Sequence, residues 1–133
     1  MKNKPIICVD FDGVIHDYKE GWQDGVIYGK VVGGFFEWYF SVRELFDIQI
    51  YSSRSKDVKM REVMKEWLQA EYEAWLVIMP PDSEYPRIFP ATYAHEKPPA
   101  YLTIDDRAIR FNGNWNTQEL SAESLKNFKP WNK

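Results

Sequence analysis

Apolar residues gather in short runs along the chain, and each run is followed by polar or turn-forming residues. Apolar positions at helical spacing lie between these runs, over residues 35–46 and 60–68. The alternation of short apolar runs with helical segments is typical of a parallel sheet whose strands are joined by helices. Four runs have the length of buried strands: residues 5–9, 48–51, 75–79 and 101–104.

This pattern predicts an α/β fold. With right-handed crossovers, we expect a three-layer, Rossmann-like parallel sheet with helices on both faces. Residues 80–99 hold six prolines and show no periodicity, so we expect an ordered loop that forms part of a pocket wall. After the last predicted strand, residues 116–128 predict a short helix that packs on the sheet through Leu120, Leu125 and Phe128.

Composition narrows the class of protein. The 133 residues, 44% of them hydrophobic, suit a single domain (1–133) with one core. The formal net charge is −3, and no run of Lys or Arg indicates a general nucleic-acid or membrane-binding surface. No apolar run is long enough for a membrane span or a signal peptide, so we expect a cytoplasmic protein. Nothing in the sequence indicates an oligomer, and Cys8 is expected to be a buried hydrophobe.

Acidic residues follow the first and the last predicted strands. Asp10 and Asp12 come after the first, and Asp105 and Asp106 come after the last. In an open parallel sheet, ligands bind beyond the carboxyl ends of the strands, where the strand order reverses. Carboxylates brought together there repel one another unless a cation binds them, and oxygen-only ligands favour Mg²⁺. The sequence therefore predicts a magnesium site suited to holding a phosphate.

A carboxylate at a strand end can also act as a nucleophile. Asp10 is expected to attack phosphorus and form an aspartyl-phosphate, which splits hydrolysis into two easier steps. Asp12, two residues further on and on the same side of the strand, is expected to protonate the leaving oxygen and then to activate water. Gly13 allows a sharp turn with no side chain beside the substrate.

Four motifs, in order, resemble those of the haloacid-dehalogenase-like superfamily. The first is Asp-Phe-Asp-Gly-Val-Ile at 10–15, and the second is an apolar strand that ends in Ser-Ser-Arg at 52–54. Lys97-Pro resembles the third motif, and Leu-Thr-Ile-Asp-Asp at 102–106 resembles the fourth. Each motif alone is weakly specific, but the ordered set at strand ends is specific and spans most of the chain.

The resemblance implies roles for these residues. Ser52 would donate to a phosphate oxygen, with Ser53 as the alternative. Lys97 would neutralise the nucleophile and the transferring phosphoryl group. We favour Asp106 over Asp105 as a direct ligand of the metal. The full set of implied Mg²⁺ ligands is the Asp10 carboxylate, the Asp12 backbone carbonyl and one acid of the final pair, Asp105 or Asp106.

Neither segment between the motifs is long enough for a large cap domain. The chain therefore resembles a capless phosphatase with a small flap at about 14–32. An open site would admit either a phosphorylated small molecule, such as a nucleotide, or a nucleic-acid end. Three alternatives to a Mg²⁺-dependent phosphomonoester hydrolase remain: a non-catalytic binding or regulatory domain of the same fold, a phosphotransferase and a dehalogenase. A dehalogenase would need neither Mg²⁺ nor the second acid.

Several residues near the motifs have two interpretations. Arg54 either binds a second phosphate or the leaving group, or pairs with a surface acid. His16 lies near the expected leaving group, but we interpret it as a satisfied surface residue and assign it no catalysis. Aromatic residues of the flap either stack on a flat substrate group or pack within the flap, and packing is favoured: Tyr18, Trp22 and Tyr28.

Overall fold

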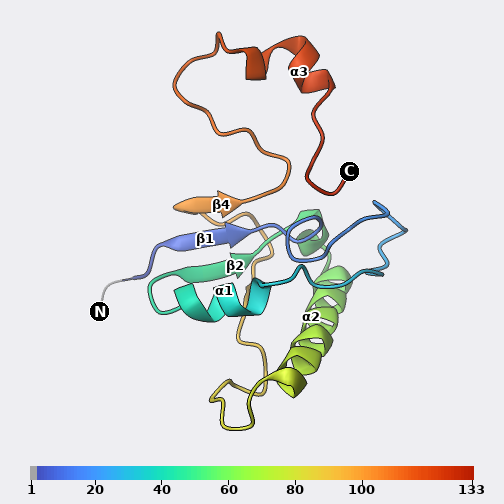
Figure 1. Ribbon diagram of the computed structural model, residues 1–133, viewed down its shortest axis with the longest axis vertical. Helices are drawn as coiled ribbons and strands as arrows, with labels where there is room; N and C mark the ends of the chain where they lie inside the picture. The colour runs from blue at the N-terminus through green and yellow to red at the C-terminus, as the bar shows by residue number, and fades with distance from the viewer. Residues whose placement is uncertain (1–2) are drawn as a thin grey trace.

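A computed structural model describes residues 3–133 as an α/β fold around a four-stranded, all-parallel sheet (Figure 1). The strand order is β3-β2-β1-β4, so β1 lies inside the sheet. The strand order reverses between β1 and β4, because β2 and β3 are added on one side of β1 and β4 on the other. The predicted α/β fold with a parallel sheet is therefore confirmed. The strands are β1 (Ile6–Val9), β2 (Asp47–Ile50), β3 (Thr92–Tyr93) and β4 (Leu102–Ile104).

Two α-helices connect the first three strands, as the apolar spacing predicts. Helix α1 (Phe35–Val42) joins β1 to β2. Helix α2 (Val58–Ile78) follows β2 after a 3₁₀ turn, η1 (Ser53–Lys56), and it begins where the Asp57 side chain accepts hydrogen bonds from two backbone N–H groups of its first turn. A second 3₁₀ turn, η2 (Gln118–Leu120), and the short helix α3 (Ala122–Lys126) come late in the chain.

The predicted strand at 75–79 is wrong, because these residues continue α2. Trp75 is the last of the buried residues that follow one helical face, after Met64, Leu68 and Tyr72. The apolar side chain of Val77 is 82% exposed, so the apolar run is not a buried strand. The third strand is instead the two-residue β3, within the proline-rich segment 80–99.

The hydrophobic core lies between the sheet and helices α1 and α2. Alternate residues of β1 and β2 point into it, and the paired register places Ile7 beside Ile48 and Val9 beside Ile50. Phe36 of α1 and Tyr72 of α2 pack in the same cluster, with ring centroids 5.4 Å apart. Both helices therefore cover one face of the sheet, and the expectation of helices on both faces is not met by this pair.

The late segment does not pack as expected. Helix α3 forms within the predicted range 116–128, but it stands away from the sheet (Figure 1). Leu125 is 47% exposed and Phe128 is 40% exposed, so these side chains do not dock on the sheet. The segment ends beside the β1 loop, where the Trp131 indole N–H donates to the carbonyl of Gly13. Within residues 3–133, none of the helices combines the length and apolarity that a membrane crossing requires.

Candidate functional site

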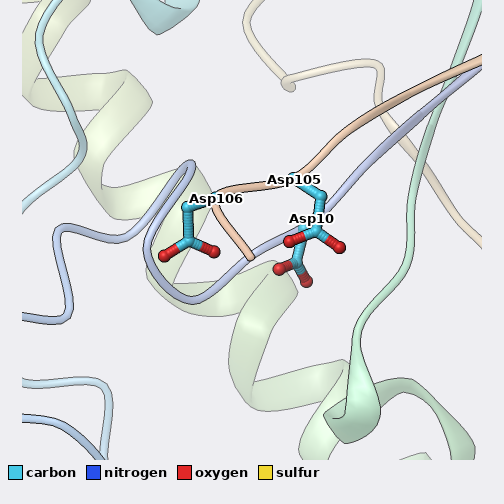
Figure 2. Close-up of side chains that lie close together, drawn as sticks. All are labelled: Asp10, Asp105 and Asp106. Carbon is cyan, nitrogen blue, oxygen red and sulfur yellow. The ribbon is translucent and has the colours of Figure 1, made fainter. Parts of the chain in front are cut away.

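Three aspartates meet at the carboxyl ends of β1 and β4 (Figure 2). Asp10 follows β1, and its backbone N–H donates to the carbonyl of Ile104 at 3.0 Å, which joins the two strand ends. Asp105 and Asp106 follow β4, and one carboxylate oxygen from each of the three aspartates lies within 4.8 Å of the others. This is the point where the strand order reverses, so ligand binding is expected here.

The cluster is electrostatically unfavourable without a cation. Burial, together with the charges of Asp105 and Asp106, raises the pKa of Asp10 to about 7. Burial and the charge of Asp105 also raise the pKa of Asp106. Both carboxylate oxygens of Asp106 are buried and have no hydrogen-bond partner among the described residues. Unpaired buried carboxylate oxygens are rare, and a bound cation would satisfy them.

Gly13 makes room for Asp106. The glycine has a φ of +85°, and a Cβ added at this position would collide with the Asp106 carboxylate. The sharp turn after β1 was predicted from the sequence, but the group that fills the space is a carboxylate of the same cluster. Gly13 therefore supports the acidic site by its missing side chain, and this contact is the role that the structure gives it.

Asp12 does not join the other three carboxylates. Its Oδ2 accepts from Arg54 Nε at 2.7 Å, and its Oδ1 accepts from Arg54 Nη2 at 3.1 Å. His16 Nδ1 lies 2.9 Å from the same Oδ1. Burial acts to raise the pKa of Asp12, but the hydrogen bonds from His16 and Arg54 outweigh it and hold that pKa below its ordinary value.

Arg54 is almost wholly buried, at 2% exposure, and its partner is Asp12 instead of a surface acid or a second phosphate. Its Nη1 also donates to the carbonyl of Gly25 at 2.7 Å, and the guanidinium lies 4.9 Å from the centre of the Trp22 ring. These contacts turn the group towards segment 14–32. The expectation that Arg54 binds substrate directly has no support in this geometry.

His16 is not a surface residue, which corrects the expectation from sequence, because its side chain is fully buried. Gly29 N–H donates to Nε2 at 3.0 Å, and a Cβ at Gly29 would collide with the imidazole. Tyr18 and Tyr28 pack edge-on against the same ring, with centroids 5.8 and 5.0 Å away. These two tyrosines therefore have the packing role that was favoured for them.

A pocket of about 210 Å³ opens beside Asp10 and Asp105. Ser53 and Lys97 line it, so two residues of the second and third motifs lie next to the acidic site. Ser52 also reaches the pocket, but its buried hydroxyl oxygen accepts from Arg54 N–H at 3.1 Å and caps η1. Ser53 is exposed and is the better placed of the two serines to donate to a ligand.

The pocket is also lined by residues for which no role at the site was predicted from the sequence: Cys8, Tyr51 and Thr103. Cys8 and Thr103 are paired in the β1–β4 register, and each lies two residues before an aspartate of the cluster. Side chains two apart on a strand share a face, so the period-two pattern was the signal for Cys8 and Thr103.

Comparisons with protein-family models, curated proteins and solved structures give no match to this chain.

Proposed function

We propose that this protein is a Mg²⁺-dependent phosphomonoester hydrolase of the haloacid-dehalogenase-like kind, acting through an aspartyl-phosphate. The observation that carries the proposal is the meeting of Asp10, Asp105 and Asp106 at the strand-order reversal, beside a pocket lined by Ser53 and Lys97. Carboxylates, a hydroxyl and an ammonium group in one small pocket match what phosphoryl transfer needs.

The donor set fits a hard divalent cation. Asp10, Asp105 and Asp106 offer only oxygen, and within residues 3–133 the buried oxygens of Asp106 lack the positive partner that buried carboxylates require. These three residues would hold Mg²⁺, with the Asp12 backbone carbonyl as the further ligand that the family resemblance implies. When bound, the ion would neutralise charge on the phosphoryl oxygens and orient them.

In the proposed reaction, an Asp10 carboxylate oxygen attacks phosphorus as the ester oxygen leaves. Lys97 places its positive charge beside the phosphoryl group, and Ser53, with Ser52 as the alternative, donates a hydrogen bond to it. Asp12 passes a proton to the leaving oxygen. It then takes one from a water that attacks the phosphorus of the aspartyl-phosphate, and the bond between phosphorus and the Asp10 oxygen breaks to release phosphate. The lowered pKa of Asp12 suits the second of these steps, because that step needs the carboxylate form.

We infer the substrate class from the absence of a large cap among the residues that the structure describes. A Rossmann-like domain with a small flap at 14–32 and no large cap would leave the pocket open to bulky esters. A phosphorylated small molecule and a nucleic-acid end both suit such a site. No basic run favours long nucleic acid, so small phosphate esters come first in a screen.

The decisive experiment measures phosphate release from a panel of phosphomonoesters with Mg²⁺ and with EDTA. Asp10→Asn should abolish release, and EDTA should abolish release by the wild type. Asp82→Asn is a matched control, because it makes the same chemical change at an exposed position in the proline-rich segment. Metal binding without turnover of any ester would favour the non-catalytic domain instead, and transfer to an added alcohol without release would favour a phosphotransferase.

A further inference from the structure

Two residues, Arg54 and His16, contact the Asp12 carboxylate. Oδ1 accepts from Arg54 Nη2 and lies 2.9 Å from His16 Nδ1, while Oδ2 accepts from Arg54 Nε alone. Gly29 N–H donates to His16 Nε2, so Nδ1 carries the ring hydrogen and donates to Asp12. A carboxylate has about four lone-pair directions, and these contacts occupy three of them.

We propose that Arg54 and His16 are positioning residues that fix the Asp12 carboxylate and leave one lone pair of Oδ2 as its proton-transfer position. The inference rests on the proposed function, since a proton-transfer role for Asp12 belongs to that function. Neither side chain needs to touch substrate for this purpose. The bidentate geometry of Arg54 sets the plane of the carboxylate, and His16 sets which oxygen is blocked.

The same two residues also hold segment 14–32. Arg54 Nη1 donates to the Gly25 carbonyl and its guanidinium lies over Trp22, while His16 accepts from Gly29. Arg54 therefore has Asp12 on one side and this segment on the other, and His16, which belongs to the segment, links Asp12 to Gly29. The orientation of Asp12 depends on where the segment lies, so the segment acts as a support for the proton-transfer group.

Stability alone does not account for this arrangement. Burying a charged Arg–Asp pair is often no more stabilising than packing apolar side chains of similar volume. Here the pair also makes directional hydrogen bonds: Arg54 donates two to one carboxylate and one to a carbonyl, and Gly29 fixes the tautomer of the histidine that donates to the same carboxylate. Directional bonds of this kind fix an orientation, which is what a general acid or base needs.

The first test is a double-mutant cycle. Arg54→Lys keeps the charge but loses the two-pronged contact, and we expect kcat to fall at least about tenfold with KM within about twofold of wild type. In an Asp12→Asn background the same change should cause no further loss, because Arg54 acts through Asp12. Arg61→Lys is the matched control, since Arg61 donates to the Ser55 carbonyl and does not contact Asp12.

The second test compares two replacements of His16. Asn places its amide nitrogen near the position of Nδ1, whereas Gln places it near Nε2. His16→Asn should therefore retain most of the activity, and His16→Gln should lose at least about tenfold in kcat. Equal loss in both His16 variants, or equal loss from Arg54→Lys with and without Asp12, would overturn the positioning role.

An NMR readout keeps this inference separate from the proposed function. In the wild type, ¹⁵N shifts should show His16 with hydrogen on Nδ1, and the Arg54 Nε–H should exchange slowly with water. Asp12→Ala should make that exchange fast. A hydrogen on Nε2, or fast exchange in the wild type, would refute the positioning role. If no ester is hydrolysed, the proposed function fails, and the NMR result still decides whether Arg54 and His16 hold Asp12.

Discussion

Replacing Gly13 with Ala tests whether the turn after β1 exists to admit Asp106. The position has a φ of +85°, so an alanine there carries the backbone strain of the left-handed region, about 1–2 kcal/mol. Its Cβ would also collide with the Asp106 carboxylate and drive it from its place in the cluster. The substitution therefore combines strain with the loss of one proposed cation ligand.

Two other glycines separate these effects. Gly113 has a φ of +93° with nothing within 4 Å of an added Cβ, and Gly33 has the same open space without a φ in the left-handed region. We expect Gly113→Ala to lose about 1–2 kcal/mol of unfolding free energy, as strain alone predicts, and Gly33→Ala to lose less. In the absence of a divalent cation, Gly13→Ala should lose about as much unfolding free energy as Gly113→Ala.

The difference should emerge when Mg²⁺ is added. Mg²⁺ at about 100 times its dissociation constant should stabilise the wild type and Gly113→Ala by about 2.7 kcal/mol. Urea unfolding with and without Mg²⁺ measures this gain. Gly13→Ala should gain much less, because Asp106 can no longer join Asp10 and Asp105. Equal stabilisation of Gly13→Ala and Gly113→Ala by Mg²⁺ would refute the argument that Asp106 belongs to the cation site.

Three further predictions concern the site and the core. Without a divalent cation, the pKa of Asp10, raised from 3.8 to about 7, means that stability falls as the pH rises through this interval. Asp10→Asn should thus be more stable than wild type at pH 8 and no more stable at pH 4, measured by urea unfolding. Ser53→Ala should weaken binding of inorganic phosphate in calorimetry, whereas Ser52→Ala should lower stability by about 1 kcal/mol through the lost cap. Leu68→Ala should cost about 2–5 kcal/mol in thermal or urea unfolding and Val77→Ala about none, and a large loss at Val77 would contradict the exposed end of α2.

The strand ends that carry the site follow from local sequence pattern. A short apolar run followed at once by Asp10, and another followed by Asp105 and Asp106, suffices to place these residues at carboxyl ends of parallel strands. The prediction of a strand at 75–79 was wrong for a physical reason. A short apolar stretch fits the end of a helix as well as a strand, and the helical register of Trp75 with Tyr72 decides between them only when α2 is seen whole.

The contacts of Asp12 with Arg54 and His16 could not be predicted from the sequence pattern, because they depend on residues elsewhere in the chain. Arg54 lies 42 positions further along the chain, and its guanidinium reaches Asp12 from η1, where the side chain is buried. His16 is closer, yet its burial depends on the missing side chain of Gly29. Long-range pairing of this kind leaves no periodic signal, so Arg54 was open to a phosphate or a surface acid as its partner.

The carboxylates of the motifs differ in their hydrogen-bond partners and in the direction of their pKa shifts, and this difference bears on function. Asp12 has hydrogen bonds from Arg54 and His16, and its pKa is held low. Asp106 and Asp10 have raised pKa values, and within residues 3–133 the buried Asp106 oxygens have no hydrogen-bond partner. Among the same residues, an arginine and a histidine contact Asp12, but no cationic side chain forms an ion pair with Asp10 or Asp106. Because unpaired buried carboxylate oxygens are unfavourable, those of Asp106 support the proposal that this cluster binds a cation.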